Sequence, residues 1–196
     1  MPAVQNDTSF ARLVSLACHD VRTPLATVHG FTTTLVRTTE LAPPADRYLE
    51  MIDAASRQIA ELLDELSLAA RIEGGRYDPH LREAETLALA RAAADRLGDD
   101  RVHVSGEGAA VETDLDAVDR GVSALVQATL RHGGLDEVDV LVRGKELDVS
   151  PVTESSAPVV LGQDLRDLGA AVAVSVIEAL GGSVSISGRT LTIRLA

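Results

Sequence analysis

Apolar residues recur at steps of three and four residues on both sides of a break at residues 41–45. Before the break these residues are Phe10, Val14, Ala17, Val21, Leu25, Val28 and Leu35, and after it they are Leu49, Ile52, Ala55, Ile59, Leu62, Leu66 and Ala69. Such spacing predicts two amphipathic helices, each with one apolar stripe. Because the break is a short Pro-Pro turn, the helices form an antiparallel hairpin, in which Asp46 is the N-cap of the second helix and Gly74-Gly75 ends it.

This hairpin alone has too little core for two stripes of such length. Each stripe can contact the neighbouring helix on one flank and needs a second cover on the other. We expect a second copy of the chain to supply that cover, which gives a dimeric four-helix bundle across a two-fold axis. The alternative is that the hairpin packs on the C-terminal part of its own chain.

The pattern changes at residue 76, where short alternating segments appear between helical ones. The expected helices are 83–97, 114–131 and 165–180, and the expected strands are 102–104, 138–142, 146–149, 183–187 and 190–195. Short turns between neighbouring strands are typical of antiparallel hairpins. This order of elements predicts the α+β class, with a two-layer α/β sandwich after the helical hairpin. We therefore divide the chain into a hairpin, residues 1–75, and a sandwich, residues 76–196.

The negative charge of the chain disfavours some classes of binding partner. Its 196 residues include 18 Lys and Arg against 30 Asp and Glu, and 2% are aromatic. The resulting net charge of −12 repels phosphate backbones and anionic lipids, so we expect no nucleic-acid or membrane binding.

The most apolar window, 168–180, is too short to span a bilayer, and no N-terminal targeting segment is visible. The single cysteine, Cys18, excludes an intrachain disulfide and suits the cytoplasm, and the five histidines show no metal-ligand spacing with it.

His19 is the candidate chemical group of the first helix. At about 100° per residue it lies about 200° from the stripe residues Ala17 and Val21, so it points outward. An exposed imidazole is mostly neutral at pH 7, and one of its ring nitrogens then has a free lone pair. Asp20 can accept a hydrogen bond from the other ring nitrogen, and Arg22 can offer donors to a phosphoryl oxygen. Judged by His19 and Asp20 alone, a solvated surface pair is the alternative.

The segment His19-Asp20-Val21-Arg22-Thr23-Pro24-Leu25, with Phe10 before it and Gly30-Phe31 after it, resembles the H-box of bacterial sensor histidine kinases. The resemblance extends to Glu73-Gly74-Gly75-Arg76, which is similar to the end of that family's dimerisation and histidine phosphotransfer hairpin. It implies that His19 is the phosphoacceptor, that Asp20 assists proton transfer, and that Thr23 positions water for dephosphorylating a partner aspartate. It also implies that the receiver domain of a response regulator docks on the hairpin. Pro24 should bend the helix one turn past His19.

Residues 76–196 resemble the catalytic and ATP-binding domain of the same family, but the nucleotide-binding motifs are degenerate. Ala124 and Ala128 fall where the family's asparagine motif holds Mg²⁺ and phosphates, and a shift by one residue brings Gln127 there, which is a poor substitute. The segment Asp148-Val149-Ser150-Pro151-Val152 keeps the acid of the adenine-reading motif but neither of its glycines. Asp167-Leu168-Gly169 keeps one glycine of the later loop, and the segment 151–163 is too short for a phosphate-covering lid. We therefore expect no ATP binding and no autophosphorylation.

Together these features predict a cytoplasmic, homodimeric histidine phosphotransferase of two-component signalling, which relays phosphate between His19 and the aspartate of a receiver domain. Its site residues are His19, Asp20, Arg22 and Thr23, it needs no cofactor of its own, and the receiver supplies Mg²⁺. In a variant of this hypothesis a separate histidine kinase phosphorylates His19. Two alternatives stay open: a pseudokinase binding module that sequesters a response regulator or pairs with a complete kinase, and an active kinase with a divergent ATP site.

Overall fold

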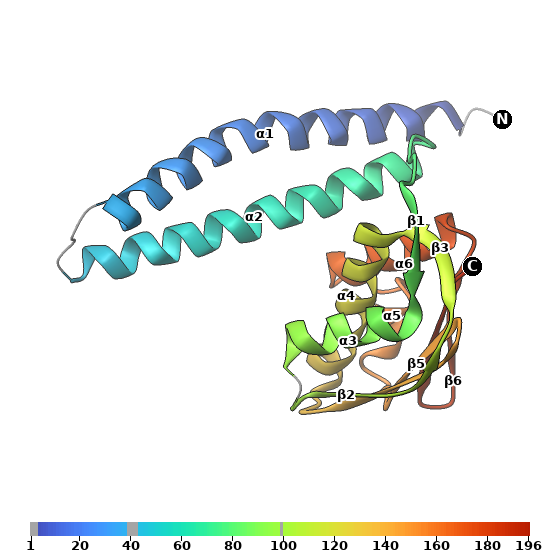
Figure 1. Ribbon diagram of the computed structural model, residues 1–196. Helices are drawn as coiled ribbons and strands as arrows, with labels where there is room; N and C mark the ends of the chain where they lie inside the picture. The colour runs from blue at the N-terminus through green and yellow to red at the C-terminus, as the bar shows by residue number, and fades with distance from the viewer. Residues whose placement is uncertain (1–3, 39–42, 99) are drawn as a thin grey trace. The chain divides into compact units, whose positions relative to one another are not determined.

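The computed structural model describes residues 4–38, 43–98 and 100–196, and it divides into two compact units, Met1–Tyr77 and Asp78–Ala196. The first unit is the predicted hairpin. Its helices, α1 (Val4–Thr38) and α2 (Ala45–Glu73), run antiparallel and side by side (Figure 1). Of the predicted break, residues 41–42 lie outside the described part of the chain.

The structure confirms the predicted C-terminal end of α2 but not the predicted N-cap. Its N-cap is Pro44, so the prediction of Asp46 was wrong. Asp46 lies in the first turn, where its carboxylate accepts the N–H of Arg47 at 2.7 Å and suits the positive end of the helix dipole. Gly74 ends α2 as predicted, and its N–H donates to the carbonyl of Ala70. In α1, Pro24 lies inside the helix without ending it, and Figure 1 shows α1 curving along its length.

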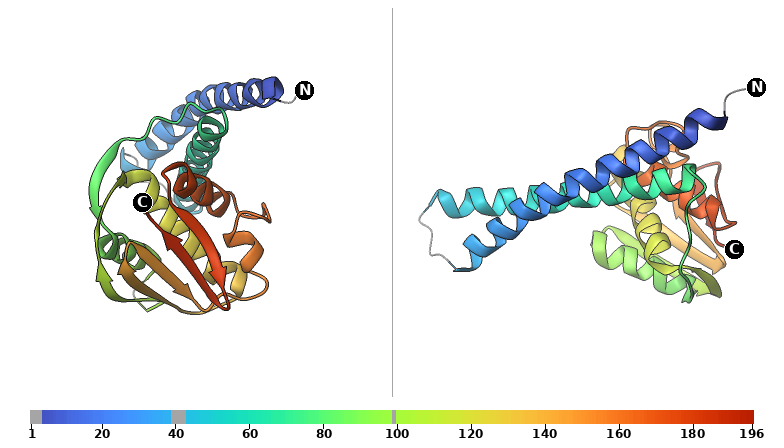
Figure 2. Two further views of the ribbon diagram at one scale, coloured as in Figure 1. Left: turned by 90° about the vertical axis from the view of Figure 1, so that its right-hand side faces the viewer. Right: turned by 90° about the horizontal axis from the view of Figure 1, so that it is seen from above.

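Small and polar side chains form the seam between α1 and α2. Its buried residues include Ala11, Cys18 and Thr32 of α1 and Ser56 and Ala70 of α2. The predicted stripe residues are instead 39–47% exposed at Val21, Val28, Leu35, Ile52, Ile59, Leu62 and Leu66. Small side chains let two helices cross closely, as the right-hand view of Figure 2 shows, so the larger apolar side chains lie beside the seam rather than in it.

The second unit is a sheet covered on one face by helices. The strand order is β2-β4-β5-β7-β6, with β2 and β4 parallel and the other pairs antiparallel. The strands are β2 (Val102–Gly108), β4 (Val138–Gly144), β5 (Glu146–Ser150), β6 (Ser183–Ser187) and β7 (Thr190–Arg194). The helices are α3 (Thr86–Leu97), α4 (Leu115–Gly133), α5 (Ala157–Val160) and α6 (Leu168–Ala179), and Figure 1 shows them on one side of the sheet. A hairpin followed by this two-layer unit confirms the predicted α+β class.

Two strands show no apolar alternation in the sequence. β1 (Leu81–Glu85) and β3 (Ala110–Asp114) pair antiparallel in a separate two-stranded sheet. β1 is polar and mostly exposed, so its first residues were assigned to no element and residues 83–85 were wrongly assigned to the following helix. That helix, α3, begins at Thr86 because the Glu85 side chain caps it by accepting the N–H of Ala88.

Successive side chains of the five-stranded sheet point to opposite faces. Val140, Val149 and Leu191 form one cross-strand row and are fully buried on the helix side. Asp148 and Thr192 belong to the next row, which points to the outer face. The acid that the sequence related to adenine recognition therefore faces away from the helices.

Candidate functional site

His19 lies on α1 with its ring in solvent. The side chain is 74% exposed, which agrees with the outward direction that helix geometry predicts. Nδ1 lies 3.4 Å from Oδ1 of Asp20, whose side chain is 68% exposed. That contact is a long hydrogen bond, so Asp20 orients the ring loosely. Because Nδ1 is turned towards the carboxylate, Nε2 is the nitrogen that meets an incoming group.

Arg22 reaches across the seam instead of standing free beside His19. Its Nη2 donates to Oδ1 of Asp64 on α2 at 2.7 Å. The two side chains are 42% and 53% exposed, so the pair lies at the solvent boundary. Arg22 is among the site residues predicted from the sequence, whereas Asp64 is not, because it is 42 residues away and belongs to no motif.

Thr23 lies one helical turn after His19, on a neighbouring part of the same exposed surface. Its side chain is exposed, and its backbone carbonyl accepts the hydroxyl of Thr27 at 3.2 Å. Three of the four predicted site residues, His19, Asp20 and Thr23, thus present polar groups to solvent. The fourth, Arg22, is tied to α2.

A second polar cluster crosses the seam further along the hairpin. Oδ1 of Asp53 accepts the hydroxyl of Thr33 at 3.0 Å and lies 2.9 Å from Nδ1 of His29, while Oδ2 pairs with Arg57 at 2.8 Å. Burial acts to raise the pKa of the Asp53 carboxyl, but Thr33, Arg57 and His29 together outweigh it and hold the pKa below its ordinary value of 3.8. The sequence signal for this cluster is Asp53, a charged residue at a seam position of α2, and it was not among the predicted site residues.

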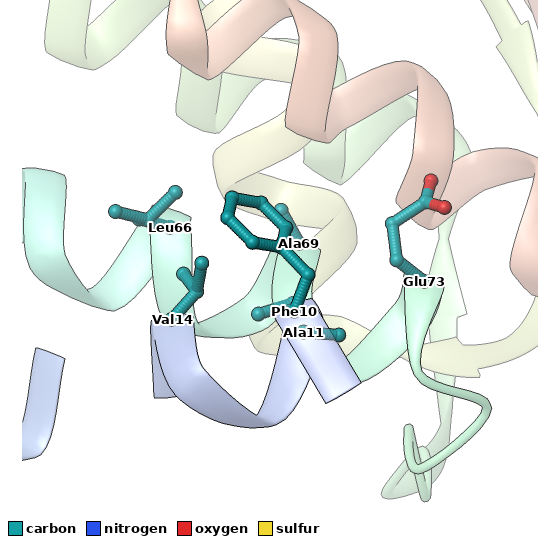
Figure 3. Close-up of a pocket in the computed structure, with 7 residues that line it drawn as sticks. Phe10, Ala11, Val14, Leu66, Ala69 and Glu73 are labelled. Carbon is teal, nitrogen blue, oxygen red and sulfur yellow. The ribbon is translucent and has the colours of Figure 1, made fainter. Parts of the chain in front are cut away.

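Two cavities open along the hairpin. One, of about 310 Å³, is lined by Arg22, Leu25, Ala26, His29, Ser56, Arg57, Ala60, Glu61 and Asp64. The other, of about 240 Å³, is lined by Phe10, Ala11, Val14, Leu66, Ala69, Ala70 and Glu73, and Figure 3 shows its apolar side chains gathered between the helices. At about 100° per residue, His19 falls on the same flank of α1 as Ala26, while Val14 belongs to the stripe. The cavity lined by Arg22 and Asp64 and the ring of His19 therefore share one flank, and the cavity lined by Phe10 lies on the stripe side.

In the second unit, the carboxylate of Asp148 is fully engaged on the outer face of the sheet. Arg143 donates to Oδ2, and the hydroxyl of Thr192 donates to Oδ1 at 2.6 Å. Asp148 is buried, so these two partners satisfy a charge that would be costly alone.

The amino end of α6 is occupied by the chain's own side chains. Oδ1 of Asp167 caps the helix by accepting the N–H of Ala170 at 3.1 Å, and Oδ2 lies 2.9 Å from Nε2 of His132. His132 and Asp167 are each 15% exposed. A carboxylate already placed at a helix N-terminus opposes the binding of a further anion there.

The positions related to the family's asparagines contain no polar side chain. Ala128 is fully buried, and Ala124 is partly buried on the same helix. Within residues 4–38, 43–98 and 100–196, no group of three or more His, Cys, Asp or Glu side chains could hold a metal ion. No helix in this described part is long and apolar enough to cross a membrane.

The hairpin matches a known family. Residues 11–75 fit the model of the His Kinase A (phospho-acceptor) domain. Over 101 residues the chain is 28% identical to the probable sensor histidine kinase TcrY of Mycobacterium tuberculosis. The alignment covers 52% of this chain and 20% of TcrY, so the chain spans about a fifth of the length of that curated relative.

Solved structures share the fold. Full-length ShkA in complex with AMPPNP superimposes with a TM-score of 0.67 at 16% identity, over 93% of this chain and 44% of that one. The histidine kinase AdeS of Acinetobacter baumannii superimposes with a TM-score of 0.56 at 18% identity, over 91% of this chain and 97% of AdeS. These structures confirm the succession of helical hairpin and α/β unit.

The hairpin matches a phospho-acceptor domain, and the fold of the whole chain is similar to that of the histidine kinase AdeS. Residues 11–75 are thus similar to the phospho-acceptor domain of histidine kinases, and part of the chain is similar to a sensor histidine kinase.

Proposed function

We propose that this chain is a cytoplasmic histidine phosphotransferase, in which His19 exchanges a phosphoryl group with the aspartate of a response-regulator receiver domain. The observation that carries the proposal is the exposed ring of His19, with Nδ1 turned to Asp20 and Nε2 turned outward, inside a phospho-acceptor domain.

The transfer forms one bond and breaks one. Nε2 of neutral His19 attacks the phosphorus of the aspartyl phosphate, the P–N bond forms, and the P–O bond to the receiver carboxylate breaks. Asp20 then stabilises the positive charge that develops on the ring through the proton on Nδ1. The receiver's own Mg²⁺ and Arg22 offset the negative charge of the phosphoryl oxygens. In a separate reaction, Thr23 orients a water molecule that attacks the phosphorus of the aspartyl phosphate, so that the P–O bond to the receiver carboxylate breaks and inorganic phosphate leaves.

Two features of the second unit support transfer without ATP. The acid related to adenine recognition, Asp148, points to the outer face of the sheet and is satisfied by Arg143 and Thr192. Asp167 occupies the amino end of α6 with negative charge and is closed by His132. A nucleotide triphosphate would have to displace these internal contacts, and Ala124 and Ala128 offer no ligand for its Mg²⁺.

The exposed stripes support a homodimer as the working form. Phe10 and Val14 from α1 and Leu66 and Ala69 from α2 line one cavity, so both stripes meet on one side of the hairpin. A second copy offers the same apolar surface, and two hairpins related by a two-fold axis bury both in a four-helix bundle. His19 lies on the opposite flank of α1 and stays accessible to a receiver.

The transfer is tested with receiver domains of the source organism, each phosphorylated with radiolabelled acetyl phosphate and freed of the donor. Label should move to the wild-type chain and not to His19→Ala. His103→Ala is the matched control, because His103 is also an exposed histidine beside a carboxylate, 3.0 Å from Glu137. Label on the His19→Ala chain, or no label on the His103→Ala chain, contradicts the proposal.

A further inference from the structure

The ion pair between Arg22 and Asp64 joins the two helices of the hairpin close to His19. Arg22 follows His19 by three residues, which places it about one turn along α1 and about 60° around the helix. Its Nη2 atom lies 2.7 Å from Oδ1 of Asp64. A residue of α2 therefore determines where the guanidinium one turn after the phosphoacceptor points.

Asp64 also competes for that cation. A guanidinium has five N–H donors, and at least one of those on Arg22 is already given to Asp64. A phosphoryl group on Nε2 of His19 adds negative charge and strong acceptor oxygens near the same guanidinium. The carboxylate of Asp64 thus offsets part of the positive charge that would otherwise stabilise phosphorylated His19.

We propose that Asp64 is a positioning residue that sets how the phosphoryl group divides between His19 and the receiver aspartate. It acts through Arg22, by holding the guanidinium across the seam and lowering the stability of phosphorylated His19. Transfer towards the receiver is favoured as a result. The inference rests on the proposed phosphotransfer at His19.

The expected effect is modest. Both side chains are about half exposed, and exposed ion pairs contribute little free energy. Removing the charge of Asp64 should therefore raise the ratio of phosphorylated His19 to phosphorylated receiver about two- to fivefold.

The test measures that ratio at equilibrium, with the full chain and one labelled receiver domain. Asp64→Asn should raise the ratio, and Asp64→Glu, which keeps the charge, should leave it near the wild-type value. The matched control is Glu61→Gln, because Glu61 lines the same cavity about one turn away from Asp64, and Arg22 pairs with Asp64. Circular dichroism establishes that each variant keeps its helices.

A double-mutant cycle separates positioning from a structural role. In an Arg22→Gln chain, the further change Asp64→Asn should leave the ratio unchanged, because the cation through which Asp64 acts is gone. An equal rise in both backgrounds, a rise of the same size in Glu61→Gln, or no rise in Asp64→Asn overturns the inference and leaves phosphotransfer at His19 intact. Absence of label on wild-type His19 overturns the proposed function and this inference together.

Discussion

The Nε2 atom of His132 lies 2.9 Å from Oδ2 of Asp167, and this contact ties the end of α4 to the beginning of α6. The other oxygen of Asp167 caps α6 through the N–H of Ala170. One carboxylate therefore satisfies a helix terminus and a partly buried imidazole that lie 35 residues apart. These contacts occupy the segment at Asp167, which resembles the later glycine-rich loop of the family.

Replacing Asp167 should destabilise the second unit. Asp167→Ala removes a helix cap and a charge-assisted contact, so we expect a loss of about 1–3 kcal/mol in the free energy of unfolding. Denaturant unfolding of the full chain measures it. Arg131→Gln is the control, because Arg131 is 3.9 Å from the same carboxylate and 72% exposed, and it should change the free energy by less than about 0.5 kcal/mol. Equal losses in both variants would contradict the role given to the His132 contact and the cap.

A charge in the apolar stripe should separate the proposed dimer. Ile59→Asp places a carboxylate where a partner's apolar side chains would cover it, so the dissociation constant should rise at least about tenfold. Sedimentation equilibrium over a range of concentrations measures this constant. Gln58→Asp introduces the same charge on a neighbouring exposed position outside the stripe and should have little effect. A monomeric wild-type chain, or equal weakening by both variants, would refute the bundle.

His103 should titrate above the ordinary histidine range. The hydrogen bond to Glu137, opposed by partial burial and helped by the charges of Glu137, Asp139 and Asp100, raises the pKa of His103 above 6.5. The stabilising contribution of this pair is therefore complete below about pH 6.5 and is lost as the pH rises through the raised pKa. An NMR titration of the His103 ring should show the pKa fall in Glu137→Gln. Asp139→Asn should move it less, and an unchanged pKa in Glu137→Gln would contradict the assignment.

Gly106 should tolerate no side chain. Its φ is +100°, and a Cβ atom built there would lie 2.0 Å from the carbonyl oxygen of Val142 on the paired strand β4. Gly106→Ala should therefore cost at least about 2 kcal/mol of folding free energy, measured by denaturant unfolding. Gly188 has a φ of +58° with open space around it, so Gly188→Ala should cost about 1 kcal/mol. A smaller loss at Gly106 than at Gly188 would show that the strand pairing relaxes.

The hairpin could be predicted because hydrophobic periodicity is a local property of the chain. The period of the apolar residues does not show which of two neighbouring faces of each helix forms the seam. Ile52, Ile59 and Leu66 give the strongest apolar signal, yet they are exposed, and the buried residues of α2 are Ser56, Ala70 and Leu68. Close helix crossing favours small residues, and a reading based on hydrophobicity passes over them.

The second unit shows the same limit for strands and for sites. The hairpin of β6 and β7 was predicted because its residues alternate, whereas the polar strand β1 has no alternation to detect. Asp148 could be found as an acid near a degenerate motif, but only the sheet register reveals that it faces outward. Asp64 could not be predicted from the sequence, because an ion pair between residues 42 positions apart produces no local pattern.

The measurement that tests the central claim most directly compares two phosphoryl donors. The full chain is incubated with radiolabelled Mg²⁺–ATP alone or with a labelled phospho-receiver alone, and the peptide containing His19 is isolated at alkaline pH, where phosphohistidine is preserved. The account predicts label on His19 from the receiver and none from ATP, with the phosphorus bound to Nε2 by NMR. Label from ATP alone, or an unlabelled His19 with every receiver of the source organism, would contradict it.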